Sequence, residues 1–81
     1  MDTIAAIASG GRAPAAIGIV RISGPDCFAV CDRIFRSGKP FGRLEPRRMA
    51  LGELLDAGGR TIDRGLAVRF PGPHSYTGED C

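Results

Sequence analysis

The sequence has no tryptophan, one histidine (His74) and no hydrophobic run of the ~18 to 20 residues that a membrane-spanning helix needs. It also lacks a CxxC pair, and a zinc site needs four nitrogen, sulfur or oxygen ligands, so we expect no metal site. Its three cysteines, an odd number, argue against a disulfide framework. The acidic start lacks the basic region of a signal or transit peptide. We therefore expect a cytoplasmic protein without a membrane segment.

Nucleotide-binding and nucleic-acid-binding patterns are also missing. Neither G-x-x-x-x-G-K-[ST] nor G-x-G-x-x-G occurs, and residues 10–12 (Gly-Gly-Arg) are explained by a flexible connection between strands. The net charge of +2 is too small for the field on which non-specific nucleic-acid binding relies. Five aromatic residues are too few for a base-stacking surface. We expect no direct nucleic-acid binding by this chain.

Glycine and proline, in contrast, are abundant: they make up 18 of the 81 residues, which predicts short elements joined by many turns in one domain. Apolar runs predict strands over residues 4–8 and 15–22. Two further runs, residues 47–55 and 61–70, flank a Gly-Gly step that fits a hairpin turn, which predicts an antiparallel pair. The predicted fold is a small α/β or α+β domain with one helix.

That helix is predicted from Ser23 as N-cap to about Phe35, with Pro25 in its first turn and Asp26 completing an acidic capping box. Apolar residues at three- and four-residue steps predict its core-facing stripe. The stripe comprises Cys27, Val30, Cys31, Ile34 and Phe35.

The last residues contain a stiff Pro-Gly-rich loop over 71–78 and a second helix-start signal, Thr77 with Asp80. At a helix start, Glu79 and Asp80 would favourably meet the positive end of the helix dipole. Because a helix would open here and stop, we expect the chain to be a fragment whose partner elements lie beyond Cys81. Ser75, His74 and Asp80 are adjacent in sequence, but adjacency does not supply the geometry of a catalytic triad.

Arg21 is the candidate functional residue. In the strand over residues 15–22 it follows Ile17 and Ile19 on one face, so a charge ends an apolar row. A strand expected to be half-buried can present such a charge to a cleft. Arginine suits this role because its fork of donors fits carboxylates and phosphates.

Three segments, DTIAA (2–6), IGIVRISGP (17–25) and FPGPHSYTGED (70–80), resemble the N-terminal domain family of the tRNA-modification GTPases called MnmE or TrmE. Residues 46–50 and 62–67 also fit the family's spacing, so the resemblance covers essentially the whole chain. Residues 9–16 depart from it, because the family usually has a Thr-Pro-Pro-Gly-Arg-Gly-Gly-type loop there.

The resemblance implies that residues 1–81 are part of an N-terminal tetrahydrofolate-binding and homodimerisation domain. Its fold would be related to the folate domains of aminomethyltransferases. The parent protein would continue into a helical domain and a GTPase that uses GTP, Mg²⁺ and K⁺. With an MnmG-type flavoprotein it would build an aminomethyl or carboxymethylaminomethyl group on C5 of the tRNA wobble uridine. 5-Formyl- or 5,10-methylene-tetrahydrofolate would supply the one-carbon unit.

The family's folate-contacting arginine matches Arg21, whereas its acidic and lysine ligands would lie beyond Cys81. Glu79 and Asp80 are therefore not substituted for that acid. The resemblance assigns no catalytic residue to this chain, and tRNA would be reached through the complex. Two alternatives stay open: a module that only dimerises, and the folate domain of an aminomethyltransferase-like protein.

Overall fold

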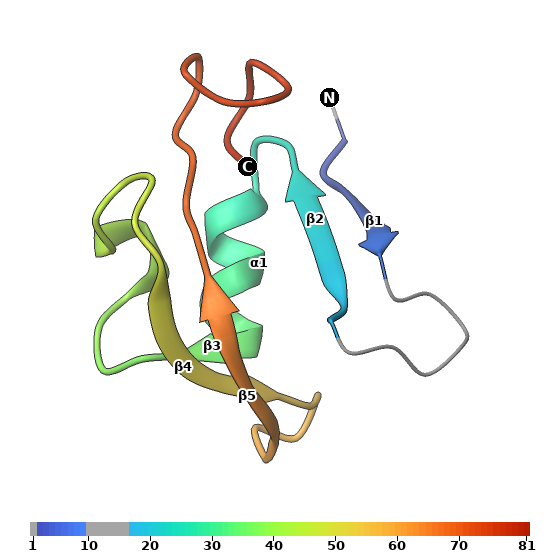
Figure 1. Ribbon diagram of the computed structural model, residues 1–81, viewed down its shortest axis with the longest axis vertical. Helices are drawn as coiled ribbons and strands as arrows, with labels where there is room; N and C mark the ends of the chain where they lie inside the picture. The colour runs from blue at the N-terminus through green and yellow to red at the C-terminus, as the bar shows by residue number, and fades with distance from the viewer. Residues whose placement is uncertain (1, 10–16) are drawn as a thin grey trace.

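The structure, a computed structural model, describes residues 2–9 and 17–81 and arranges them as two antiparallel sheets and one α-helix (Figure 1). The first sheet pairs β1 with β2, and the second has the order β3-β4-β5. The predicted α+β class is confirmed, although the strands form two sheets. In chain order the elements are β1 (Ile4–Ser9), β2 (Ile19–Ser23), α1 (Cys27–Ile34), β3 (Phe35–Arg36), the 3₁₀ helix η1 (Phe41–Arg43), β4 (Ala50–Leu55) and β5 (Thr61–Ala67).

The predicted hairpin is formed by β4 and β5, whose register runs from Ala50↔Ala67 to Leu55↔Thr61 with a shift before its last pair. Asp56 holds the turn, because its Oδ1 accepts hydrogen bonds from the backbone N–H groups of Gly58 and Arg60, both at 2.9 Å. This Asx-type bonding fixes the turn locally, so a short-range pattern was sufficient to predict it.

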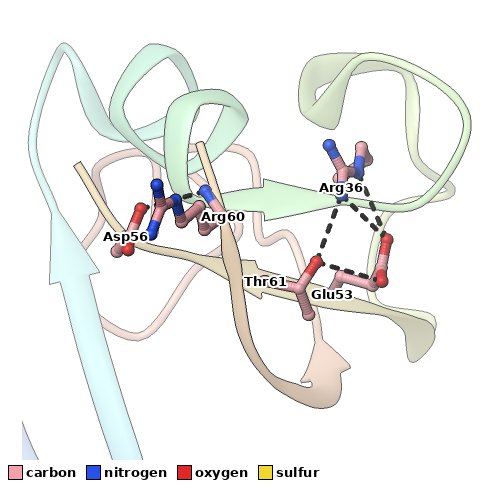
Figure 2. A network of polar contacts seen from close by, with 5 residues as sticks. All are labelled: Arg36, Glu53, Asp56, Arg60 and Thr61. Atoms are coloured by element: carbon pink, nitrogen blue, oxygen red, sulfur yellow. Dashed lines mark hydrogen bonds and ion pairs between the residues drawn. The ribbon is translucent and has the colours of Figure 1, made fainter. Parts of the chain in front are cut away.

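A third strand, β3, extends this sheet directly from the end of α1. Phe35 leaves the helix in an extended conformation and pairs with Leu54. Beside this pair, the Arg36 guanidinium contacts Glu53 Oε1 at 3.1 Å and Thr61 Oγ1 at 3.2 Å, so one polar network joins three strands (Figure 2). Hydrogen bonds from Thr61 and Arg36 lower the pKa of the Glu53 carboxyl. Because the network is solvent-exposed, it specifies register more than it adds stability.

The core lies between α1, η1 and the second sheet. Phe35, Phe41 and Leu44 form its buried cluster, and the rings of Phe35 and Phe41 pack edge to face with centroids 6.0 Å apart. This arrangement corrects the predicted helix stripe, because Val30 and Ile34 are 38% and 39% exposed. The helix is rotated so that Phe28 packs against the cluster instead.

Ser23 does not cap the helix, which corrects the predicted start. The N-cap position is Asp26, and no side-chain hydrogen bond caps the helix there. Ser23 belongs to β2 and is buried, and its hydroxyl bonds the side chain of Thr77, 54 residues later. A tertiary partner has thus replaced the local one that the capping pattern implied.

The predicted helix start at Thr77 is likewise wrong, because the structure forms bends over residues 74–79. Thr77 Oγ1 bonds Ser23, and the Asp80 carboxylate accepts from the backbone N–H of Gly72 at 3.0 Å. The backbone of Cys81 pairs with that of Phe70 in both directions, at 2.8 and 3.0 Å. The side chains of Thr77 and Asp80, which were expected to begin a helix, therefore hold this segment against β2 and against the backbone of Gly72.

The β1–β2 ribbon stands beside α1, to the right in Figure 1. Its register pairs Ala6 with Arg21 and Ile7 with Val20. Most of its residues are exposed, which corrects the expectation of a half-buried strand. The first residues of the strand predicted over 15–22, and the glycines of residues 10–12, lie outside the described residues. None of the helices described is long and apolar enough to cross a membrane.

A matched pair of glycines tests the packing of this sheet. Gly52 and Gly65 face each other in the register, but a Cβ at Gly52 would lie 2.5 Å from Phe35 Cζ, whereas one at Gly65 would lie 3.5 Å from Leu54 Cδ1. We expect Gly52→Ala to lower the free energy of unfolding by about 2 kcal/mol through overpacking. Gly65→Ala should change it by less than about 0.5 kcal/mol, as surface substitutions usually do. Urea unfolding of both variants measures the difference, and equal effects would contradict the described packing.

Candidate functional site

The candidate site lies where β2 meets the segment over residues 75–80. Alternate residues of a strand share a face, so Arg21 and Ser23 project from the same face of β2. Arg21 contacts Tyr76 and Ser23 contacts Thr77. Two neighbours on one face of the strand thus contact two neighbours in the loop, Tyr76 and Thr77. These two contacts fix the loop against the strand.

Arg21 and Tyr76 form an exposed cation–π pair. The guanidinium carbon lies 4.4 Å from the centroid of the tyrosine ring, and Tyr76 is 80% exposed. A guanidinium that stacks through its face keeps its N–H groups, which lie in its plane, available as donors. The pair therefore brings guanidinium donors next to an exposed aromatic ring.

Ser23 is the buried residue of the site and contacts two residues of the loop. It is 4% exposed, and its Oγ lies 2.7 Å from Thr77 Oγ1 and 3.4 Å from Glu79 Oε2. Since Glu79 can only accept when it is ionised, the serine hydroxyl donates in the longer contact. The Ser75 hydroxyl also donates to the Glu79 carbonyl and tightens the loop.

An open hollow of about 280 Å³ adjoins these contacts. Its walls come from the turn between β2 and α1 and from the C-terminal segment, and the two are joined by a hydrogen bond from Gly24 N to the Asp80 carbonyl at 3.0 Å. Two acidic residues, Glu79 and Asp80, belong to the lining. The lining residues are Pro25, Gly72, Gly78, Glu79 and Asp80.

Of the site residues, the sequence indicated only Arg21. Tyr76, Thr77 and the role of Ser23 were missed, because their contacts join positions more than 50 residues apart and no local pattern encodes them. Ser75, His74 and Asp80 form no triad, since no hydrogen bond links their side chains within the described part of the chain.

Two thiols, those of Cys27 and Cys31, lie on α1, the helix that follows β2 in the chain. Cys27 is fully buried and its Sγ donates to the carbonyl of Ile22 at 3.2 Å. Burial and the neighbouring Cys31 thiol raise the pKa of Cys27 to about 12. Burial also raises the pKa of Cys31. Both groups are protonated near neutral pH and act as small apolar side chains rather than nucleophiles.

Comparison with known sequences identifies the family of this chain. The family model described as "GTP-binding protein TrmE N-terminus" matches residues 3–81. The chain belongs to this family. It is 49% identical over 81 residues to a tRNA modification GTPase MnmE of Symbiobacterium thermophilum, covering 98% of this chain and 18% of the relative. It is 48% identical to proteins of the same name from Hyphomonas neptunium and Roseiflexus castenholzii, covering 98% of this chain and 17% of each relative.

The chain thus spans less than a fifth of the length of these members of the TrmE family. Its residues differ in how well they fit the groups that the sequence resemblance led us to expect. The Arg21–Tyr76 pair suits a flat heteroaromatic ring with polar edges, as in a folate. GTP does not fit, because the 81 residues contain no phosphate-binding loop sequence. Within the described residues no three acidic, cysteine or histidine side chains are grouped to hold a metal ion.

The protonated state of Cys27 is tested by alkylation. At pH 8 we expect iodoacetamide to modify buried Cys27 at least about tenfold more slowly than partly exposed Cys81, because only an accessible thiolate reacts. Peptide mass spectrometry gives both rates in one sample, and urea should remove the difference. Equal alkylation rates of Cys27 and Cys81 in the native protein would contradict the burial of Cys27.

The raised pKa of Cys27 also makes stability depend on pH. Because folding raises the pKa of Cys27, the contribution of this thiol to stability is complete below pH ~9 and is lost as the pH rises toward 12.

Proposed function

We propose that this chain supplies one side of a tetrahydrofolate site, with Arg21 as its folate-contacting residue. The observation that carries this proposal is the exposed pair of Arg21 and Tyr76, in a site whose Ser23 contacts Glu79 in the lining of the open hollow. The match of Arg21 to the family's folate-contacting arginine supports the same residue.

The chemistry of the pair suits the two ends of a folate. A pterin is flat and has a polar edge, so it can stack on an aromatic or guanidinium face while it accepts hydrogen bonds. The glutamate tail of a folate carries carboxylates, for which a guanidinium is a bidentate donor. Glu79 and Asp80 take no part as the family's acidic ligand, because both are engaged within the protein.

On this proposal the chain serves a longer tRNA modification GTPase as its folate-binding and dimerisation module. The GTPase, with GTP, Mg²⁺ and K⁺, would lie in the remainder of that protein, and the flavoprotein partner would be of the MnmG type. The folate, as the 5-formyl or 5,10-methylene derivative, would provide the one-carbon unit for C5 of the wobble uridine. This chain would perform no chemical step, and the reaction would take place in the cytoplasm.

Calorimetric titration of 5-formyltetrahydrofolate tests the site. We expect Arg21→Ala to weaken binding by about 1.5 to 3 kcal/mol, as the loss of a charge-assisted hydrogen bond does. Arg64→Ala is the matched control, because Arg64 is also an exposed strand arginine and lies on β5. Since the resemblance places further ligands beyond Cys81, a longer version that completes the domain is titrated in parallel. If the folded longer version does not bind folate, or Arg21→Ala binds as tightly as Arg64→Ala, the assignment of Arg21 fails.

A second function, homodimerisation, is favoured by the ribbon face opposite Arg21. Ile7 and Val20 are directly paired across the strands, yet they are 66% and 64% exposed. They share the face with Ala5 and partly buried Ile22. An apolar cross-strand row left in water is a surface that association can cover. We propose that a second copy covers this face.

Sedimentation velocity tests the dimer. We expect the double variant Ile7→Thr/Val20→Thr to sediment as a monomer at concentrations where the unaltered chain dimerises. The control Ile62→Thr/Leu66→Thr changes two comparably exposed residues of β5 and should leave association unchanged. If the unaltered chain stays monomeric, or if both variants dimerise equally well, this face is not the interface.

A further inference from the structure

The positive charge of the chain is concentrated in one segment. Residues 39–48, called here the basic segment, contain four basic residues and one acid (Glu45), for a net charge of +3. The rest of the chain contains seven basic and eight acidic residues, a net charge of −1. The overall charge of +2 therefore conceals a local excess. The four basic residues are Lys39, Arg43, Arg47 and Arg48.

The basic segment is fixed to the core by its backbone and its apolar residues. Phe41 and Leu44 are each 4% exposed, and the backbone N–H of Phe41 donates to Asp32 Oδ1 at 2.9 Å. The Arg69 guanidinium donates to the Leu44 carbonyl through two nitrogens, at 3.0 and 2.7 Å. The Arg47 N–H in turn donates to the Arg69 carbonyl at 2.8 Å. The segment is thus a built surface rather than a free loop.

Its four basic side chains, in contrast, are exposed and take part in no hydrogen bond or ion pair among the described residues. Arg21, Arg36 and Arg69 differ from them, because each contacts another side chain within the protein. Charges that are held on a fixed backbone and have no partner among residues 2–9 and 17–81 are available to an external anion.

Two details bring these charges together. Arg47 has φ of 59°, a left-handed conformation that is unusual for a non-glycine residue, and it lies in a turn. Lys39 and Arg48, nine positions apart, border the same hollow of about 140 Å³, together with Glu45. A basic residue from each end of the basic segment thus lies at one hollow.

We propose that the basic segment binds the phosphate backbone of RNA. Several closely spaced cations without an aromatic platform favour contacts with phosphates rather than with bases, because base readout needs stacking or edge contacts. The proposal rests on the proposed role in tRNA modification for the identity of the polyanion. It departs from the expectation of no direct nucleic-acid binding, which depended on the small net charge and the few aromatic residues and took no account of how the charge is distributed.

The basic segment lies at the left edge of Figure 1, whereas β2 with Arg21 lies to the right of α1. The two segments therefore lie on different sides of α1. This separation also lets each be altered without affecting the other.

Fluorescence anisotropy with a fluorescein-labelled tRNA transcript, at ~50 to 200 mM KCl, tests the proposal. The variant Arg43→Gln/Arg47→Gln/Arg48→Gln should bind about tenfold more weakly at low salt, and its log–log salt slope should be smaller by about 2 to 3. The control Arg33→Gln/Arg60→Gln/Arg64→Gln loses the same charge outside the basic segment and should stay within about twofold of the unaltered chain. Lys39→Gln/Arg48→Gln, which leaves Arg47 in place, is a control for misfolding at that turn. Because it removes two charges instead of three, its salt slope should fall by about two-thirds as much.

Equal losses in the two triple variants, or no tRNA binding by a chain shown by circular dichroism to be folded, would overturn the proposal. Binding of phosphatidylserine vesicles or polyglutamate as tight as that of tRNA would overturn the choice of RNA. Folate titration of the Arg43→Gln/Arg47→Gln/Arg48→Gln variant separates the two proposals, because its folate binding should be unchanged. If no version binds folate, the proposed folate site fails while the tRNA result stands.

Discussion

Gly24 occupies a position with no room for a side chain, and three parts of the fold meet there. A Cβ at this residue would collide with the Cα of Thr3 and lie 2.8 Å from the carbonyl of Asp2, and its φ of 137° disfavours other residues. Its N–H also donates to the Asp80 carbonyl. The approach to β1, the β2–α1 turn and the C-terminal segment can close together only because this residue is glycine. The contacts of Arg21 and Ser23 with the loop over residues 75–80 depend on that closure.

The sequence predicted what short-range patterns determine. Asp56 and the glycines after it encode the hairpin turn, and alternation in the strands identified Arg21 as a charge that ends an apolar row. Prediction failed at Ser23 and Thr77, where each hydroxyl matched a capping pattern but found its partner in the other, 54 positions away. Helix-capping rules consider neighbours along the chain only, so they cannot anticipate a tertiary partner that competes for the same hydroxyl.

The three surfaces proposed here lie on different faces of the fold. One face of the β1–β2 ribbon carries the arginine–tyrosine pair, the opposite face carries the exposed Ile7 and Val20, and the basic segment extends from Lys39 through η1 toward β4. A domain that accounts for 17% to 18% of the length of its relatives could thus contact a small molecule, a second copy and a polyanion at separate places. The surface for the polyanion is recognised by how charge is distributed along the chain, because the total charge does not reveal it.

The distance along the chain between Ser23 and Thr77 has a consequence for the order of folding. The hairpin closes a loop from Leu55 to Thr61, whereas the Ser23–Thr77 contact closes one of 54 residues. Chain entropy makes the longer closure costlier by about 2 kcal/mol, and closure becomes easier once intervening elements are compact. Loop-closure entropy therefore favours formation of the hairpin before β2 meets the C-terminal segment. The arginine–tyrosine pair joins the same two segments, so it depends on this long-range closure and not on any local element.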